Sequence, residues 1–238
     1  MSYNYTTYVA DLANLLVIPS TDADYQTVLP NIIDDAEQRI YRDIDLLNTI
    51  TRDYSAAFTT GTRTFNLPAT NGTFYVVDSI YAITPFGTAV PDNGTRNELF
   101  PVSRPFLTAT YPSSNGSTVP AYFAMTTQTS LIVGPWPDQA YQVEVVGTIR
   151  PAPLGSTNVT TLLTAYLPDL FIAASMVFGA AYLQNFGQSV DNPQMGVNWE
   201  SHYQTLLKSA QTEESRKKFT GEGWSSKQPA PLATPPRT

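Results

Sequence analysis

Acidic side chains lie closest together at Asp34, Asp35 and Glu37, and this cluster is the first candidate for chemistry. Paired carboxylates can cleave a glycosidic bond, one acting as an acid and the other as a base or nucleophile. Asp34 and Asp35 are adjacent in a predicted helix, however, and adjacent helical residues point about 100° apart. We therefore interpret the cluster as a solvated helix face, with cell-wall hydrolysis as a less favoured alternative.

Composition excludes most histidine and cysteine chemistry. The chain has no cysteine, which removes disulfides, zinc–thiolate sites and thiol nucleophiles. One histidine, His202, cannot build a multi-histidine metal site within a subunit, and we expect it to pack or cap in a helix. The sequence has no phosphate-binding glycine loop, nucleophile elbow or metal-ligand spacing. We predict no catalytic residue, no cofactor and no metal, and therefore no enzyme.

Two helices are predicted before residue 48. Apolar residues at three- and four-residue steps predict a short amphipathic helix over residues 5–17 that ends before Pro19. The apolar residues of this helix are Tyr8, Leu12, Leu15 and Leu16. The same period predicts a second helix over residues 24–47. Pro30 leaves two alternatives open, because it lies either in the first turn of a helix capped by Thr27 or inside a longer, kinked helix.

Alternating and β-branched residues replace the helical period from about residue 49 to residue 150. Turn residues divide this region into two hairpins, two long strands, one short helix and an exposed loop. The expected hairpins pair residues 54–58 with 62–67 and residues 121–125 with 130–133. The long strands are expected at 74–84 and 141–150, the short helix at 101–111 and the loop at 112–118.

Helical periodicity returns at residues 166–186, and Asn192-Pro193 predicts the N-terminus of a last helix. The apolar side of that helix carries Met195, Trp199, Tyr203, Leu206 and Ala210. We therefore predict an α+β fold in which residues 1–48 and 158–215 form a domain resembling a four-helix bundle. Residues 49–157 form an inserted antiparallel domain like a β-sandwich or barrel, and residues 216–238 form an extended C-terminal tail.

Charge is distributed unevenly along the chain. Residues 1–215 hold nineteen acidic and eight basic side chains, a net charge of −11, whereas residues 216–238 hold five basic side chains and one acidic. Only 14% of all residues are charged and 12% are aromatic, which favours broad uncharged contact surfaces. The chain starts without a secretory signal, and its most apolar stretch is shorter than the roughly 20 residues of a membrane span. We expect a cytoplasmic protein without membrane contact.

Three stretches of the sequence resemble one protein family. They are Ala36-Glu37-Gln38-Arg39-Ile40-Tyr41-Arg42-Asp43, then Pro120-Ala121-Tyr122-Phe123-Ala124 leading to Leu131-Ile132-Val133-Gly134-Pro135-Trp136-Pro137-Asp138, and Tyr166-Leu167-Pro168-Asp169-Leu170. Together they resemble the head-to-tail adaptor, or connector, proteins of tailed bacteriophages, related to tail tubular protein A of short-tailed phages. One departure is that the segment after Asn158 lacks the expected tryptophan.

The resemblance implies a structural subunit in the neck of a virion, assembled in the cytoplasm of the bacterial host. It implies a homo-oligomer of about twelve copies that joins the portal protein to the tail nozzle or tail tube protein and leaves a channel for DNA. The helical part would form the ring, and the stretch after Glu213 would reach the portal. An acidic channel wall would repel phosphate, so DNA would pass without specific binding.

The basic tail is the candidate portal-docking segment. Its apolar anchors would be Phe219 and Trp224, and Arg216, Lys217 and Lys218 would meet acidic portal surface. A nucleic-acid arm is the weaker alternative for this segment, because five bases in 23 residues form no sustained block of charge. For the whole chain, a carbohydrate- or receptor-binding virion protein is the main alternative, suggested by the Tyr-, Thr- and Asn-rich middle region.

Overall fold

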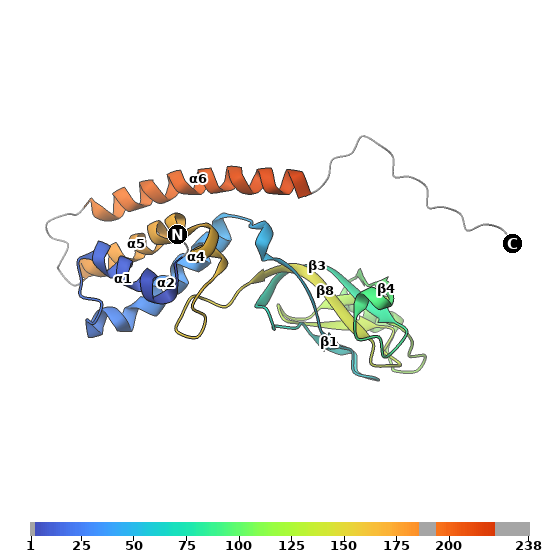
Figure 1. Cartoon of the computed structure of the whole chain (residues 1–238). Helices are drawn as coiled ribbons and strands as arrows, with labels where there is room; N and C mark the ends of the chain where they lie inside the picture. Colours follow the sequence, from blue (N-terminus) through green and yellow to red (C-terminus); the bar gives the residue numbers. More distant parts are fainter. Residues whose placement is uncertain (1–2, 186–193, 222–238) are drawn as a thin grey trace.

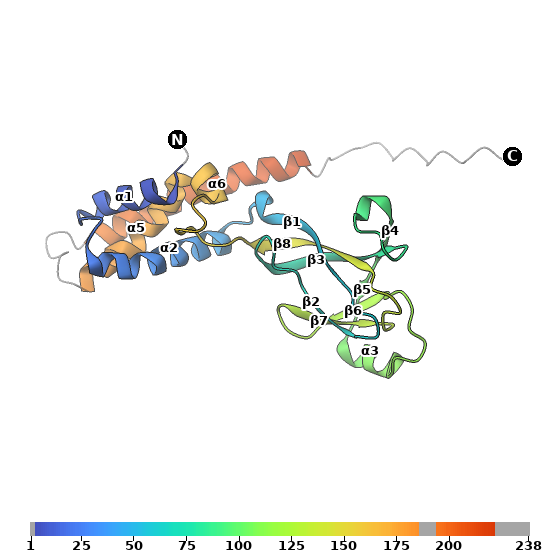
Figure 2. The same cartoon turned by 60° about the horizontal axis from the view of Figure 1, so that its bottom comes forward.

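A computed structural model of the chain describes residues 3–185 and 194–221, and it contains a helical lobe and a β lobe placed end to end (Figure 1). The helices of the described residues are α1 (Tyr5–Leu16), α2 (Ala23–Asp43), α3 (Arg104–Thr110), α4 (Leu162–Tyr166), α5 (Pro168–Asn185) and α6 (Met195–Gly221). Short 3-10 turns follow α2 as η1 (Leu47–Thr49) and precede β4 as η2 (Pro91–Asn93). The helical lobe holds every α-helix but α3, which belongs to the β lobe (Figure 2).

The first helix confirms the expectation from its period. Asn4 caps α1 by accepting a 2.9 Å hydrogen bond from the backbone N–H of Thr7, and the Thr7 side chain accepts from the Asn4 backbone in return. The helix ends at Val17, which takes a left-handed conformation ahead of Pro19. Leu15 departs from the expected apolar face, because it is exposed to solvent.

The second helix settles the alternatives left open by Pro30. Helix α2 begins at its N-cap Asp22 and contains Pro30 as an internal residue, so a start at Thr27 is wrong and the longer helix is correct. The helix ends at Asp43, four residues earlier than expected. The chain is then extended at Ile44 before it enters η1.

Two four-stranded sheets make up the β lobe, ordered β1-β8-β3-β4 and β2-β7-β6-β5. The strands are β1 (Ile50–Ala57), β2 (Thr64–Asn66), β3 (Thr73–Thr84), β4 (Thr95–Glu98), β5 (Phe100–Pro101), β6 (Tyr122–Met125), β7 (Ser130–Gly134) and β8 (Gln142–Arg150). Every pair is antiparallel except β5 with β6. No closed barrel forms among the described strands, and the fold is mixed α+β.

One expected hairpin formed and the other did not. Strands β6 and β7 pair as expected, with Phe123 opposite Val133. Strand β1 pairs instead with β8, and β2 pairs with β7, so residues 54–58 and 62–67 lie in different sheets. The turn between them still exists, because the N–H of Thr62 donates to the Thr59 carbonyl at 3.0 Å. The correct local turn therefore joins two sheets rather than two paired strands.

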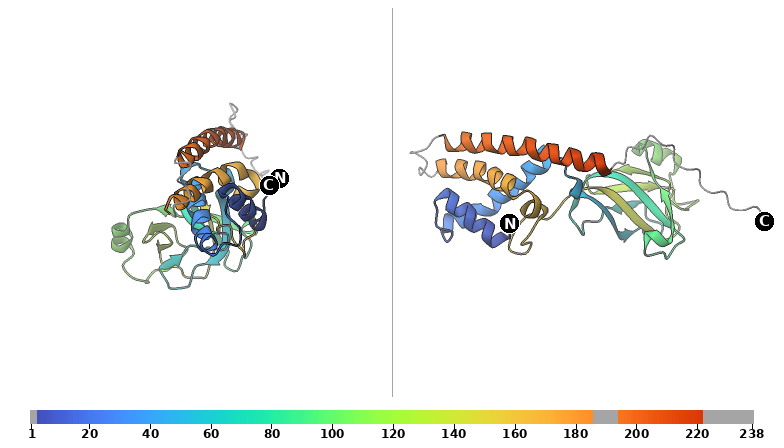
Figure 3. Two further views of the ribbon diagram at one scale, coloured as in Figure 1. Left: turned by 90° about the vertical axis from the view of Figure 1, so that its left-hand side faces the viewer. Right: turned by 45° about the horizontal axis from the view of Figure 1, so that its top comes forward.

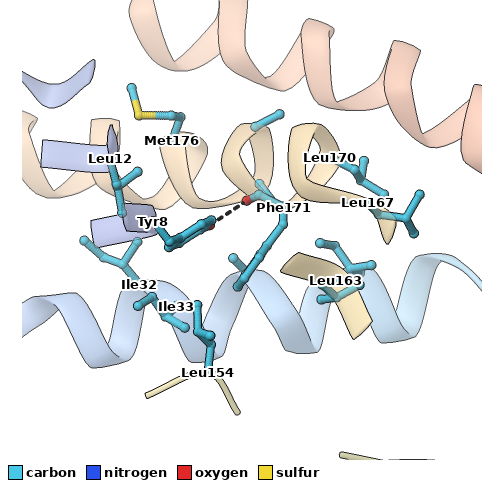
Figure 4. Close-up of a cluster of buried hydrophobic side chains, with 14 of the residues drawn as sticks. Tyr8, Leu12, Ile32, Ile33, Leu154, Leu163, Leu167, Leu170, Phe171 and Met176 are labelled. Atoms are coloured by element: carbon cyan, nitrogen blue, oxygen red, sulfur yellow. Dashed lines mark hydrogen bonds between the residues drawn. The ribbon is translucent and has the colours of Figure 1, made fainter. Parts of the chain in front are cut away.

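Each lobe has its own core. In the helical lobe, side chains from α1, α2 and α5 interdigitate, and the hydroxyl of Tyr8 donates to the Phe171 carbonyl at 3.1 Å (Figure 4). The small residues of α5 allow close approach, since Leu16 packs directly over Gly179. In the β lobe, both sheets contribute to one core; among its members are Ile80, Leu131, Val143 and Val145.

Helix α6 extends the helical lobe beyond the expected boundary. It lies against α5 and runs to Gly221, so Arg216, Lys217 and Lys218 are helical and the expected extended tail does not begin at residue 216 (Figure 3). The expected N-cap Asn192 and most of the tail lie outside the described residues. None of the helices in the described ranges is both long and apolar enough to cross a membrane.

Candidate functional site

The basic end of α6 is held against the rest of the chain. Lys217 lies 2.7 Å from carboxylate oxygens of both Glu213 and Glu214, and Lys218 forms an ion pair with Asp45 in the segment after α2. Arg216 is exposed. Lys217 and Lys218 are therefore held by carboxylates within the same chain. The side chain of Phe219 and the whole of Trp224 lie outside the described residues.

The same end of α6 is also fixed by hydrogen bonds to the segment that leads into the β lobe. A carboxylate oxygen of Glu214 accepts from the backbone N–H of Leu47 at 3.0 Å. The side-chain amide of Gln211 donates to the Asp43 carbonyl at 3.0 Å. These two hydrogen bonds attach the C-terminal end of α6 to the segment that connects the helical lobe with the β lobe.

A second cluster fastens the middle of α6 to α2. The guanidinium of Arg39 donates two hydrogen bonds, of 2.8 and 2.6 Å, to the carboxylate of Glu200, and this hydrogen bonding holds the pKa of that carboxyl below its usual value. The same guanidinium lies 4.1 Å from the ring centre of Tyr203, whose hydroxyl donates to Asp43 at 2.8 Å. The cluster is structural, since each charged group in it is directed at a neighbouring helix.

The acidic cluster that sequence reasoning weighed for catalysis is split by the fold. Asp35 is exposed, whereas Glu37 is only 2% exposed and accepts a 3.1 Å hydrogen bond from the backbone N–H of Leu154. Burial raises the pKa of Glu37 to about 7. Asp34 and Glu37 both line a pocket of about 110 Å³, which is far below the roughly 300 Å³ of ordinary ligand sites.

A larger groove lies where the lobes meet. It measures about 810 Å³ and is lined by the turn before β3 and by the connection after β8. Arg150 is the one charged residue of this lining, which has no carboxylate or histidine. The groove therefore offers no acid–base pair for hydrolysis.

An ion-pair network covers one face of the first sheet. The carboxylate of Glu144 lies 2.6 Å from Arg52 and 3.0 Å from Arg96, and Asp92 contacts the same two arginines at 2.9 and 2.5 Å. Two acids and two bases give a network with no net formal charge. The sequence did not predict this network, because its members come from β1, β4, β8 and η2, which are separated along the chain.

Aromatic side chains gather on the second sheet around α3, the helix expected at residues 101–111. Phe106 of α3 packs edge-on against Tyr122 of β6 at 6.1 Å, while Phe100 of β5 and Met125 of β6 are exposed. Figure 2 shows α3 on the outer side of this sheet, on the part of the β lobe distant from the helices. The surface is suited to protein contact, since aromatic residues and methionine are enriched in interfaces.

The single histidine does not pack inside the helical lobe. His202 is exposed on α6, and its ring meets the edge of Trp199 at 5.7 Å. Within residues 3–185 and 194–221, no three histidine or carboxylate side chains cluster as metal ligands would. Several charged residues instead form ion pairs between elements, such as Arg39 with Glu200 and Lys218 with Asp45.

Comparison with known proteins agrees with the resemblance seen in the three sequence stretches. The family model described as SU10 adaptor protein matches residues 3–226, which is nearly the whole chain and includes both lobes. No curated protein gives a significant match to this chain. The chain therefore belongs to the family of the phage SU10 adaptor protein, a family of structural adaptors, and the resemblance to phage head-to-tail adaptors is confirmed.

Proposed function

We propose that this protein is the head-to-tail adaptor of a tailed phage virion, a ring of about twelve copies that joins the portal to the tail nozzle or tail tube. The observation that carries this proposal is the match of the SU10 adaptor family over residues 3–226. The subunit would be assembled in the host cytoplasm and remain in the virion neck. In this role it acts as a structural protein, without catalysis and without a cofactor.

Charge supports a DNA channel through the ring. Residues 1–215 carry nineteen acidic against eight basic side chains, and several of the bases are neutralised within the fold by partners such as Glu200 and Glu144. A ring of such subunits repels the phosphate backbone on average. DNA therefore passes through the channel without specific binding.

The helical lobe is the part that we propose closes the ring, with α1, α2, α5 and α6 arranged as a bundle. Its helices share one core, and its elements are fastened to one another by the Arg39–Glu200 pair and the contacts of Glu214. A rigid block of this kind keeps a fixed angle to its neighbours, which a closed ring requires.

The C-terminal segment remains the proposed portal contact. Arg216, Lys217 and Lys218 would meet acidic portal surface, with Phe219 and Trp224 as the apolar anchors. Because Lys217 and Lys218 form ion pairs within the chain, docking through them would have to compete with those contacts. Removal of residues 222–238 tests portal docking separately from the packing of α6 on the helical lobe, because α6 ends at Gly221 and stays complete. Loss of portal binding by this truncated chain supports the proposal, and undiminished binding contradicts it.

An amber mutation in the phage gene tests the function as a whole. Infection of a non-suppressing host is expected to yield heads without attached tails, visible by negative-stain electron microscopy. A plasmid copy of the wild-type gene should restore tailed particles. Normal tailed virions without the protein would refute the proposed function, and binding of the pure chain in a glycan array would favour the carbohydrate-binding alternative.

A further inference from the structure

The helices of the helical lobe differ in how many charged residues they expose to solvent. Eleven residues of 194–212, at the beginning of α6, are exposed, and Lys208 is the one of them that is charged at neutral pH, whereas exposed charges follow later in the helix at Glu213 and Arg216. Five residues of α1 are exposed, and none is charged. On α2, by contrast, four of nine exposed residues are charged: Asp24, Asp35, Arg42 and Asp43. A helix that faces water is normally charged on its outer side, so α1 and the first part of α6, up to residue 212, are the exceptions.

The two uncharged faces lie on different sides of the lobe. Helix α5 packs against both α1 and α6, with α6 on one side and α1 and α2 on the other (Figures 1 and 3). A ring built from identical subunits needs two different surfaces of one subunit that fit each other, because each copy meets a neighbour on either side. The uncharged faces of α1 and α6 satisfy this requirement.

Each uncharged face also exposes an apolar anchor. On the α1 side, Val17 is 88% exposed and has a φ of 58°, a left-handed conformation that a β-branched residue rarely adopts. On α6, Val197 is 64% exposed. The end of α1 and the beginning of α6 lie at the same end of the lobe, so both anchors are at the end remote from the β lobe (Figure 1).

We propose that the uncharged face of α6 in one copy packs on the uncharged face of α1 in the next copy, and that this contact is the subunit interface of the ring. This inference rests on the proposed function. The occupant is a second copy because the exposed residues of α1 carry no charge and those at the beginning of α6 carry only that of Lys208, so neither face presents a charge cluster for an acidic or basic partner, and interface centres are depleted of charge. The charged face of α2 then stays in contact with water, where its carboxylates keep their hydration.

Single charges placed on the two anchors test the interface. The variants are Val17→Glu and Val197→Glu in the full-length chain, with Val90→Glu as the matched control in the β lobe, where Val90 is 43% exposed. We expect the wild type and V90E to form rings on the portal protein in native mass spectrometry. V17E and V197E should lose ring formation by about tenfold or more while keeping the circular dichroism of the wild type.

A mixture of the two variants gives a sharper result. V17E keeps an intact α6 face, and V197E keeps an intact α1 face. One copy of each can therefore form an undamaged contact with the other. The two faces left over in this pair both carry the introduced glutamate and cannot add a further copy. Mixing is expected to raise the amount of dimer without restoring rings. Rings of wild-type stoichiometry from V17E or V197E alone would overturn the interface, whereas a wild-type chain that never forms a ring would overturn the proposed function first.

Cross-linking checks the interface without disrupting it. The natural chain has no cysteine, so introduced thiols are unique. A short bis-maleimide should join the double variant Val17→Cys/Val197→Cys into a ladder of oligomers in the presence of the portal. The control Asn31→Cys/Val197→Cys, with one thiol on the exposed face of α2, should give no such ladder. Equal ladders from both variants, or none from the first, would contradict the assignment.

Discussion

Replacement of Glu37 by glutamine is expected to stabilise the protein at alkaline pH and to have little effect at acidic pH. Glu37 is buried on α2 beside the backbone N–H of Leu154, which glutamine can still satisfy with its amide oxygen. Burial raises the pKa of the carboxyl from 4.5 to about 7 in the folded state. Ionisation of this side chain therefore opposes folding.

The size of the effect follows from the two pKa values. Below pH 4.5 the carboxyl is protonated in both the folded and the unfolded chain, so it contributes no pH-dependent penalty. Between pH 4.5 and 7 the unfolded chain ionises first, and the free energy of unfolding falls. Above pH 7 the penalty is complete at about 3.5 kcal/mol, since one pKa unit corresponds to roughly 1.4 kcal/mol.

Urea unfolding at pH 4.5 and pH 8, followed by circular dichroism, measures the effect. E37Q should be more stable than the wild type by about 2–3 kcal/mol at pH 8 and by less than about 1 kcal/mol at pH 4.5. Glu98→Gln is the control, because Glu98 is exposed on β4 and should change stability little at either pH. An E37Q chain that is no more stable than the wild type at pH 8 would refute the reasoning.

Three further outcomes are expected. Arg39→Met should destabilise the chain by about 1–2 kcal/mol in urea, and a double-mutant cycle with Glu200→Gln should show coupling, whereas strict additivity would exclude the pair as a contributor. Gly147→Ala should lower the melting temperature by several degrees, because a Cβ at this position overlaps the backbone of β3. Gly155→Ala is the control and should leave the melting temperature unchanged, because a Cβ there meets no other atom within 4 Å. Equal melting temperatures of the two variants would contradict this prediction. Removal of residues 222–238 takes away Trp224, Lys227 and Arg237 and should weaken portal binding in pull-down assays but leave the melting temperature unchanged, and a large drop in that temperature would show a role in folding.

Features set by local sequence were predictable from the chain. The helical period of α1 and its end before Pro19, the long strand β3 and the β6–β7 hairpin all depend on residues close in sequence, and each was found as expected. The C-terminal end of α6 was not predicted, because composition alone suggested that an extended tail begins at residue 216. The helix continues there because Lys217 and Lys218 find carboxylates on α6 itself and beside α2.

Features set by distant partners were not predictable. Strand β1 leaves its expected hairpin for β8, which lies about 90 residues away in sequence, and no local pattern distinguishes the two pairings. Glu37 looked like part of a solvated face, and only the backbone of Leu154, 117 residues later, explains its burial. The α1 and α6 faces likewise carried no signal until the structure showed which of their residues are exposed.

Native mass spectrometry of the full-length chain, alone and with the portal protein of the same phage, tests the central claim most directly. The account predicts a closed ring of about twelve copies bound to the portal. A chain that remains a monomer in the presence of the portal would contradict it.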